Sequence, residues 1–231
     1  MQASPSSLKT RLELSAILYD LDGTIADTDP THFIAWQECL RPYGIEINPE
    51  FYEQRMSGKL NPVLIAELLP HLSVEESEQL ADFKEARFRE LARQLPPMQG
   101  LRELIDWASR RGLKQAVVTN APRENVQFML DSLKLSQVFD QVVIADDLGI
   151  GKPDPTPYTH TLEQLGLESN QAIAFEDSPS GVRSAVAAGI FTVGVTSTQT
   201  PEALQKLGVE LAIADFTDTT LWSLLNEAKV S

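Results

Sequence analysis

The sequence predicts an α/β protein, with a Rossmann-like parallel sheet as its core and an all-helical domain inserted into it. Two observations predict this class. Short aliphatic and β-branched runs alternate with patterns of helical spacing, which is typical of a parallel sheet covered by helices on both faces. The interval from about 28 to 96 contains helical patterns but no convincing strand, so we expect helices alone in that interval.

Six short apolar runs are the predicted strands of the core. Their lengths and their Val, Ile and Ala content suit buried strands. The runs are AILYD (16–20), AVVT (116–119), VVIAD (142–146), AIAFED (172–177), FTVGV (191–195) and ELAIAD (210–215). Since a helical pattern follows most of them, we expect βα steps that form one parallel sheet.

The predicted helices of the core carry apolar residues at helical spacing. These stripes fall at 101–108, 126–133 and 162–165. Gly112 ends the first, and Thr156 with Pro157 provides a cap and a first-turn proline for the third. Gly166 is a natural stop for that third helix.

The insert is predicted to hold at least two helices. One carries Ala35, Trp36, Cys39 and Leu40, and a later one carries Leu80, Phe83, Phe88 and Leu91. Ser73 and Glu76 form a capping-box pattern in front of the second helix. Pro96 and Pro97 mark a rigid return to the core. The expected domains are therefore a catalytic core of residues 1–27 and 97–231, and an insert of residues 28–96.

Composition limits the choice of partners and compartment. The 231 residues carry a formal net charge of -14, which makes nucleic acid and anionic membranes poor partners, and no obligate protein partner is evident. A small anionic substrate remains possible if a metal ion supplies local positive charge. No run approaches the roughly 18 apolar residues of a spanning helix, and MQASPSSLKTRLELS is interpreted as a polar tail rather than a signal peptide. The single cysteine, Cys39, fits a reducing cytoplasm.

Chemistry-bearing residues follow several of the predicted strands. Asp20 and Asp22 end the first, Thr119 ends the second, and Glu176 with Asp177 ends the run at 172–177, while Lys152 lies in a loop. Ligands of open α/β sheets gather outside the carboxyl ends of the strands. We therefore expect these residues to converge, although they are far apart in sequence.

Two close carboxylates repel each other unless a cation or another partner compensates. Mg²⁺ suits a site with few carboxylates and several waters, and Asp20 and Asp177 would supply its side-chain ligands. Asp20 is the better-placed nucleophile for a phosphoryl group, whereas Asp22 can protonate the departing oxygen and later deprotonate water. Thr119 can donate to a phosphoryl oxygen, and Lys152 can offset negative charge.

Each of these features alone also has a structural interpretation. A DxD pattern is common in turns and caps, and Thr119 with Asn120 could simply cap a helix. Lys152 could be a solvated loop lysine. The segment 176–178 could cap the helix that follows it. The order of the features and their places at strand ends favour the chemical interpretation.

The chain resembles the haloacid dehalogenase superfamily, most of whose members are Mg²⁺-dependent phosphatases. The matching motifs are DLDGT (20–24), VVTNA (117–121), GKPDP (151–155) and FEDSPSGVRSAVAAG (175–189). The resemblance implies a helical cap over the active site, Asp20 as nucleophile, and Asp22 as acid and base. It also implies phosphate contacts from Thr119 and Lys152, and metal ligation by Asp20, Asp177 and the main-chain carbonyl of Asp22. Dehalogenating members generally lack the second aspartate, so Asp22 favours phosphoryl chemistry.

The segment DTDPTHFIAW (27–36) is similar to the β-phosphoglucomutase-like, or CbbY-like, group. That likeness makes His32 a candidate for contacting substrate or positioning Asp22, with a polar hinge residue as the equal alternative. Asn120 and Lys59 are further candidates for substrate binding. Mutases of that group carry an arginine where this chain has Asn61, so that only Arg123 and Lys59 remain as cations for a second phosphate.

The sequence thus predicts a Mg²⁺-dependent phosphatase that hydrolyses a small phosphomonoester, such as a sugar phosphate, through an aspartyl phosphate. Two alternatives remain open. One is a phosphomutase of the β-phosphoglucomutase type, and the other is a non-catalytic protein that binds a phosphorylated metabolite.

Overall fold

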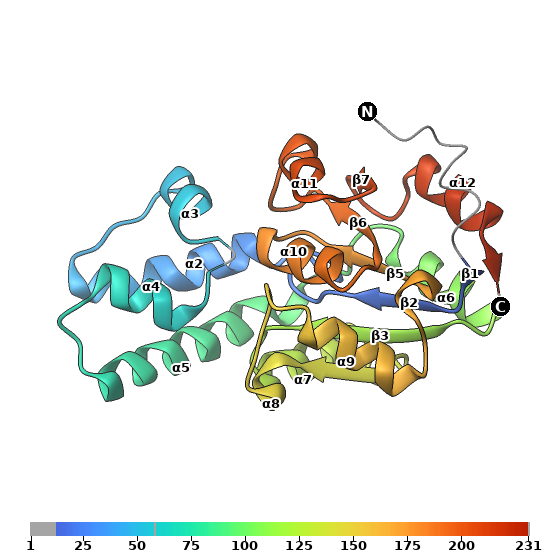
Figure 1. The fold of residues 1–231 in the computed structure, drawn as a ribbon. Helices are drawn as coiled ribbons and strands as arrows, with labels where there is room; N and C mark the ends of the chain where they lie inside the picture. The colour runs from blue at the N-terminus through green and yellow to red at the C-terminus, as the bar shows by residue number, and fades with distance from the viewer. Residues whose placement is uncertain (1–12, 58, 231) are drawn as a thin grey trace. The chain divides into compact units, whose positions relative to one another are not determined.

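The computed structural model describes residues 13–57 and 59–230, so most of the predicted polar tail lies outside the described part. Contacts divide the chain into two compact units, Met1–Asp27 with Pro96–Ser231, and Thr28–Leu95. The larger unit holds the sheet (Figure 1). Within residues 28–57 and 59–95, the smaller unit has helices and no strand.

The core sheet has six parallel strands. They are β2 (Ala16–Tyr19), β3 (Lys114–Thr119), β4 (Gln141–Ile144), β5 (Ala172–Glu176), β6 (Phe191–Val195) and β7 (Leu211–Ile213). Their order in the sheet is β4-β3-β2-β5-β6-β7, and every pair is parallel. The predicted α/β class is confirmed.

The strand order reverses next to β2. From β2 the chain moves outward to β3 and β4, and it then returns to the other side of β2 for β5, β6 and β7. The point between β2 and β5 is therefore the topological switch point, where open α/β sheets bind ligands. Both strands are buried along their whole length.

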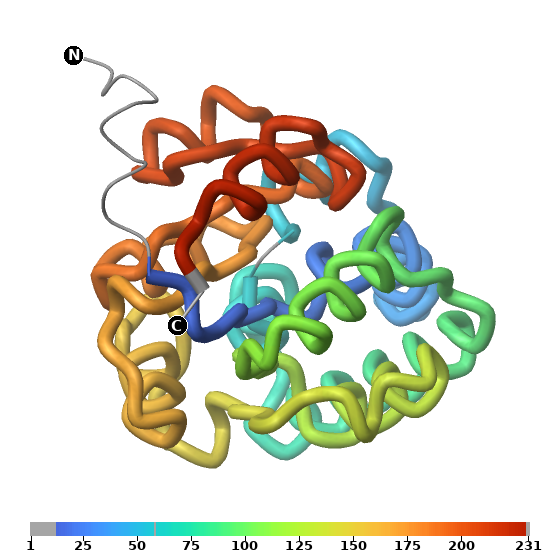
Figure 2. The backbone as a smooth tube through the Cα atoms, turned by 90° about the vertical axis from the view of Figure 1, so that its right-hand side faces the viewer, coloured from blue at the N-terminus to red at the C-terminus, as the bar shows by residue number. Residues whose placement is uncertain are grey.

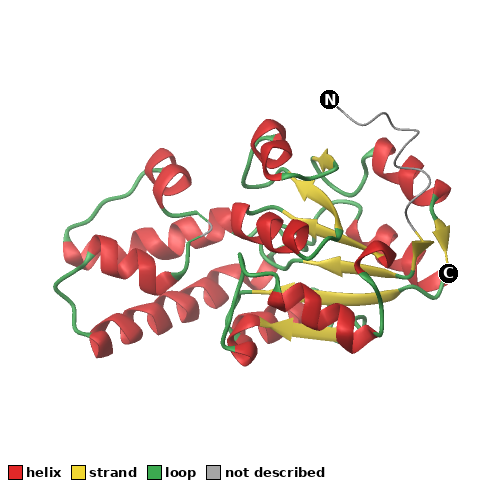
Figure 3. Cartoon of the chain, in the orientation of Figure 1, coloured by secondary structure: helices red, strands yellow, loops and turns green. Residues whose placement is uncertain are grey.

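Seven helices among the described residues belong to the larger unit. They are α6 (Leu101–Arg110), α7 (Arg123–Ser132), α8 (Ala145–Leu148), α9 (Thr156–Leu165), α10 (Pro179–Ala187), α11 (Pro201–Leu207) and α12 (Thr219–Glu227), with the 3₁₀ turn η3 (Ser169–Gln171) before β5. Figure 3 shows these helices on both sides of the strands.

Alternating side chains place helices on both faces of the sheet. Ala116 and Val118 of β3 lie in one core cluster with Tyr158 of α9 and Ala185 of α10. Gln115 points to the opposite face, where its Nε2 donates to the main-chain oxygen of Ile105 in α6. Since successive residues of a strand face opposite ways, α6 lies across the sheet from α9 and α10.

A second, two-stranded sheet joins the two ends of the described chain. Strand β1 (Glu13–Leu14) pairs in parallel with β8 (Lys229–Val230). Figure 2 shows this pairing as the meeting of the blue and red ends of the tube. Neither strand was predicted, because a strand of two residues is too short to show a periodic pattern.

Three local predictions were wrong. The run VVIAD continues as a strand only to Ile144, and α8 begins at Ala145. Thr156 is the first residue of α9 rather than its cap, and its hydroxyl donates to Asp154 Oδ1 at 2.5 Å. Phe83 was expected on an apolar stripe, yet it is 59% exposed.

The smaller unit has its own apolar core. Its helices are α2 (Asp29–Leu40), α3 (Pro49–Arg55), α4 (Asn61–Leu68) and α5 (Val74–Leu91), with 3₁₀ turns η1 (Arg41–Tyr43) and η2 (Ala92–Gln94). Trp36, Leu40 and Leu64 are buried in one cluster. The predicted capping box of Ser73 and Glu76 is present at the start of α5. Nowhere in the described chain does a helix have both the length and the apolar character needed to cross a membrane.

Candidate active site

The ends of β2 and β5 bring the predicted acidic residues together. Tyr19, the last residue of β2, lies opposite Phe175 of β5, and the Asp20 amide donates to the Phe175 carbonyl at 3.0 Å. Asp20 is thus the first residue beyond β2, at the level where β5 ends with Glu176. The switch point is therefore lined by carboxyl groups.

Three buried carboxylates form a compact cluster. Asp20, Glu176 and Asp177 each offer one oxygen, and these oxygens lie within 4.8 Å of one another. Carboxylate oxygens are the donors that hard dications prefer, so this donor set fits a magnesium-type ion. The sequence predicted side-chain ligation by Asp20 and Asp177 and left Glu176 open, and the structure places Glu176 in the same cluster.

Lys152 bridges two of these carboxylates. Its Nζ donates to Asp20 Oδ1 at 2.5 Å, to Glu176 Oε1 at 2.6 Å and to the Val118 carbonyl at 2.7 Å. The side chain is buried. Burial alone would lower the pKa of Lys152, but contact with Asp20 and Glu176 outweighs burial and raises it. Lys152 therefore stays charged. Because its side chain is buried, it is not the solvated loop lysine of the structural interpretation.

The Asp20 carboxyl is not fully compensated by Lys152. Burial is the largest cause that raises the pKa of Asp20 to about 8, Lys152 opposes it, and the carboxyls of Glu176 and Asp22 add to it. A carboxylate that serves as a nucleophile near neutral pH needs more positive charge than one ammonium provides. Further positive charge, such as that of a bound dication, would lower the pKa of Asp20.

Asn120 holds the loop that carries Lys152. Its Nδ2 donates to the Lys152 carbonyl at 3.2 Å, and its Oδ1 accepts from the Lys152 amide at 3.0 Å. These two bonds tie the end of β3 to the GKPDP loop. Asn120, expected as a substrate contact, has its side-chain amide engaged in positioning Lys152.

Thr119 ends β3 beside the cluster, and it is almost fully buried. Its hydroxyl oxygen accepts from the Ala121 amide at 2.9 Å. This bond is the local turn or cap interaction that the sequence analysis weighed against a phosphate contact. An accepting hydroxyl still carries its own proton, so the bond leaves the chemistry of a donor intact.

A tight turn after β2 carries Asp22. The Gly23 amide donates to the Ala26 carbonyl at 2.8 Å, and the Ile25 amide donates to the Leu21 carbonyl at 2.9 Å. Asp22 forms an isolated β-bridge with Ala26 and is half-buried. The turn thus fixes the main chain of Asp22 two residues beyond Asp20.

Close packing against Gly23 holds Asp177. A Cβ on Gly23 would lie 2.2 Å from Asp177 Oδ2, and Gly23 has a φ of +77°. The Thr198 hydroxyl donates to the same Oδ2 at 2.7 Å. Thr198 was not found from the sequence, because it lies in a polar loop without a motif. Ser178, as the cap alternative proposed, accepts from the Gly181 amide at the start of α10.

Tyr158 is a second residue that sequence reasoning missed. Its hydroxyl donates to Glu176 Oε1 at 2.6 Å, and its ring lies 5.3 Å from Lys152 Nζ. Burial raises the pKa of Tyr158 well above its usual value, so the phenol remains a donor. Tyr158 and Leu162 are spaced like core residues of a helix, and that spacing gives no sign of the polar contact.

His32 and Lys59 belong to the smaller unit. His32 Nδ1 lies 2.9 Å from Lys84 Nζ, and its ring stacks on Phe88 with centroids 4.0 Å apart. Lys59 forms an exposed ion pair with Glu67 at 2.8 Å.

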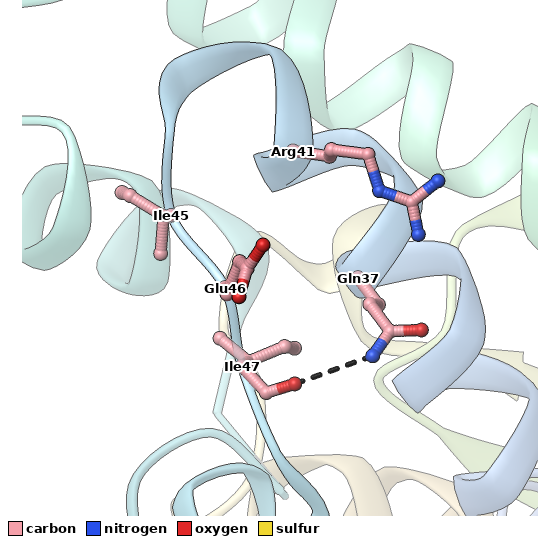
Figure 4. A pocket seen from close by; sticks show the side chains of 5 residues that line it. All are labelled: Gln37, Arg41, Ile45, Glu46 and Ile47. Atoms are coloured by element: carbon pink, nitrogen blue, oxygen red, sulfur yellow. Dashed lines mark hydrogen bonds between the residues drawn. The ribbon is translucent and has the colours of Figure 1, made fainter.

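The smaller unit also contains a shallow pocket of about 230 Å³ (Figure 4). Its lining residues are Gln37, Arg41, Ile45, Glu46 and Ile47. Gln37 Nε2 donates to the Ile47 carbonyl at 3.3 Å across it. None of the predicted site residues lines this pocket.

The sequence and fold match known hydrolases. The model of the haloacid dehalogenase-like hydrolase family matches residues 17–195. Validoxylamine A 7'-phosphate phosphatase of Streptomyces hygroscopicus subsp. limoneus is 31% identical over 203 residues, which cover 84% of this chain and 91% of the relative. A phosphorylated carbohydrates phosphatase of Thermotoga maritima is 30% identical over 182 residues, which cover 77% and 82%.

The fold is also similar to that of a solved structure. CbbY from Rhodobacter sphaeroides, crystallised as a variant with xylulose-(1,5)-bisphosphate, has a TM-score of 0.79 at 25% identity, covering 89% of this chain and 96% of that one. The superfamily and the phosphoric monoester hydrolase class predicted from the sequence are confirmed. The chain belongs to the haloacid dehalogenase-like hydrolase family.

Proposed function

We propose that this protein is a Mg²⁺-dependent phosphatase that hydrolyses a small phosphorylated metabolite through an aspartyl phosphate, an acyl phosphate formed on Asp20. The observation that carries the proposal is the cluster of Asp20, Glu176 and Asp177 with Lys152 bonded to Asp20 Oδ1. Asp20 would supply the attacking oxygen, while Lys152 and a dication held by the acidic cluster would offset the charge of a dianionic phosphoryl group.

The proposed metal ligands are the carboxylates of Asp20 and Asp177, with the Asp22 main-chain carbonyl and a Glu176 oxygen completing the protein's share. Bound Mg²⁺ would supply positive charge that holds Asp20 ionised and draws charge from the phosphoryl oxygens. The place of Glu176 in the cluster supports its assignment as a ligand. Water and substrate oxygens would fill the remaining positions.

The proposed chemistry has two steps. In the first, an Asp20 oxygen bonds to phosphorus while the bond to the leaving oxygen breaks, and Asp22 gives that oxygen a proton. In the second, Asp22 takes a proton from water, whose oxygen bonds to phosphorus and releases phosphate from Asp20. Thr119 donates to a phosphoryl oxygen and Lys152 balances the charge in both steps.

The smaller unit is proposed as the cap domain, which selects the substrate and contributes His32 and Lys59 to substrate binding. Phosphorylated sugars are the proposed class. This choice rests on the Thermotoga maritima relative, whose name gives phosphorylated carbohydrates as substrates, and on the CbbY structure with a sugar bisphosphate.

Hydrolysis is favoured over phosphoryl transfer within a bisphosphate, because a mutase must hold two phosphates. Arg123, expected as a possible anion contact, is paired with Asp147 at 2.5 Å. The Asn61 amide donates to Glu85 at 2.5 Å, and Lys59 is paired with Glu67. The Asn61 position is therefore neutral, while Arg123 and Lys59 form exposed ion pairs that a second phosphate would have to displace.

Phosphate release from a panel of phosphorylated metabolites, with and without Mg²⁺, tests the proposal. We expect release from one or more sugar phosphates with Mg²⁺, and almost none in EDTA. A protein that binds these compounds without releasing phosphate would instead support the non-catalytic alternative. Mg²⁺-independent release would contradict the metal's role.

A further inference from the structure

The two oxygens of Glu176 have different surroundings. Oε1 accepts two hydrogen bonds, one from Lys152 Nζ and one from the Tyr158 hydroxyl, both at 2.6 Å. Oε2 is buried and has no hydrogen-bond partner among the described residues. An unpaired buried carboxylate oxygen is unfavourable unless a ligand uses its lone pairs.

We propose that Tyr158 is a positioning residue, which fixes the Glu176 carboxylate so that Oε1 faces protein donors and Oε2 is left for the metal ion. The proposal rests on the proposed function, since it assumes a metal at the acidic cluster. Tyr158 itself touches neither substrate nor metal and acts through Glu176.

The placement of Tyr158 suits this role. It lies in the first turn of α9, in the core cluster that packs on β3 and β5, and it is fully buried. Because the core packing fixes the Tyr158 ring, its hydroxyl is directed at Glu176 Oε1. Lys152 cannot fix Glu176 alone, because its ammonium is shared with Asp20 and the Val118 carbonyl.

A further contact limits the motion of the same carboxylate. A Cβ on Gly181 in α10 would lie 1.8 Å from Glu176 Oε2. The same Cβ would lie 2.1 Å from Glu176 Cδ and 2.2 Å from Oε1, so the whole carboxylate group is packed against the backbone of α10. Removing a group that hydrogen-bonds to a metal ligand commonly lowers the metal affinity by about tenfold or more.

Tyr158→Phe removes the hydroxyl and keeps the ring, so it is the direct test. Tyr19→Phe is a matched control, because the Tyr19 hydroxyl also makes a buried hydrogen bond, to Gln115 Oε1 at 3.0 Å. Asp177→Asn shows whether the bound metal occupies the acidic cluster, because it removes one of the proposed ligands. Binding of Mn²⁺, a paramagnetic substitute for Mg²⁺, is measured for the folded variants by electron paramagnetic resonance, without any assay of turnover.

We expect Mn²⁺ binding that Asp177→Asn removes, that Tyr158→Phe weakens by roughly tenfold, and that Tyr19→Phe leaves unchanged. Equal Mn²⁺ affinities in the two Tyr→Phe variants would overturn the positioning role while leaving the proposed function intact. If wild-type binding is absent or does not depend on Asp177, the metal site of the proposed function is overturned, and the role of Tyr158 with it.

A second measurement covers the case in which Tyr158→Phe does not fold. The chain has four tyrosines, and wild-type protein labelled with 3-fluorotyrosine gives a ¹⁹F signal for each. Tyr→Phe variants at 19, 43 and 52 assign the signal of Tyr158 by elimination. We expect diamagnetic Mg²⁺ to shift the Tyr158 signal more than that of Tyr19, and equal or absent shifts would overturn the proposal.

Discussion

Lys152 is the residue that balances the buried charge of the candidate site. Its ammonium forms ion pairs with both Asp20 and Glu176, and all three side chains are buried. Removing one partner of a buried ion pair leaves the other charge without compensation. We therefore expect Lys152 to contribute to stability as well as to the proposed chemistry.

Lys152→Met tests this dependence. The variant keeps an unbranched apolar stem, so we expect the loss of turnover together with a loss of about 3–5 kcal/mol in the free energy of unfolding. Denaturant titration without divalent metal measures the second effect. Lys114→Met is the control, since Lys114 forms an exposed pair with Asp140. A Lys152→Met protein as stable and active as wild type would contradict the charge balance described here.

Motifs located some site residues but not the ones that support them. Asp20 and Asp177 could be predicted to converge because each directly follows a parallel strand, and Lys152 because it lies in the GKPDP motif. Tyr158 and Thr198 could not, since their side chains meet Glu176 and Asp177 only after the chain has folded. Asn120 was predicted as a substrate contact, and the hydrogen bonds of its amide to Lys152 could not be predicted from its motif.

At the scale of elements, helix α10 approaches the site closely because residue 181 is glycine. In a helix interior, alanine is normally more stabilising than glycine by about 1 kcal/mol. Here the added Cβ would lie 1.8 Å from Glu176 Oε2. Gly181→Ala should therefore destabilise the protein and weaken Mn²⁺ binding. Thermal unfolding and metal titration check both effects, with Arg183→Ala on the exposed side of α10 as the control. A stabilised Gly181→Ala protein with unchanged affinity would refute the close approach.

The helices α2, α4 and α5 enclose a buried charged group in the smaller unit. Lys84 Nζ lies 2.8 Å from Glu85 Oε1 and 2.9 Å from His32 Nδ1. Burial by itself raises the pKa of Glu85, but Lys84, His32 and Asn61 outweigh it, and the pKa of Glu85 lies below its usual value of 4.5. A depressed carboxyl pKa contributes stability above pH 4.5, and this contribution is lost as the pH falls through the folded-state pKa.

Glu85→Gln tests that linkage. At pH 7 we expect the variant to lose about 2 kcal/mol in the free energy of unfolding, because Lys84 remains buried without its acid. The difference from wild type should shrink as the pH falls below 4.5. Glu67→Gln is the control, since Glu67 and Lys59 are both well exposed. A difference that stays constant from pH 7 to pH 3 would show that Glu85 acts through packing alone.

Strong local signals decided which elements could be predicted. The run FTVGV is β6 residue for residue, and the capping box starts α5 as expected. The end of β4 was placed too late, because Ala145 and Asp146 are compatible with either structure and tertiary contacts select the short helix α8. Phe83 fitted the apolar stripe, yet periodicity alone does not show which positions a neighbouring helix covers.

At the scale of the whole molecule, the choice between phosphatase and mutase depends on cations outside the acidic cluster. Arg123 is bound to Asp147, and Asn61 stands where mutases of the similar group carry arginine. With a hexose 1-phosphate and a trace of hexose bisphosphate as primer, we therefore expect inorganic phosphate as the product. Chromatography of the products checks this, and accumulation of the hexose 6-phosphate would establish the mutase instead.

The sheet order and the acidic cluster together explain why separate motifs act at one place. Parallel strands β2 and β5 are neighbours although about 150 residues separate them. Alternation of strands and helices predicts the sheet, but it does not identify the residues that would bind a substrate. Substrate choice depends on surface side chains, which no folding requirement constrains.

Phosphorylation of Asp20 is the central claim, and rapid quenching with a turned-over substrate tests it most directly. Mass spectrometry of the quenched protein should find one phosphoryl group on the peptide that contains Asp20, removable by hydroxylamine and absent in Asp20→Asn, which should fold but lose activity by about 10³-fold or more. Phosphate release that proceeds without any phosphorylated peptide, or that persists in Asp20→Asn, would contradict the account.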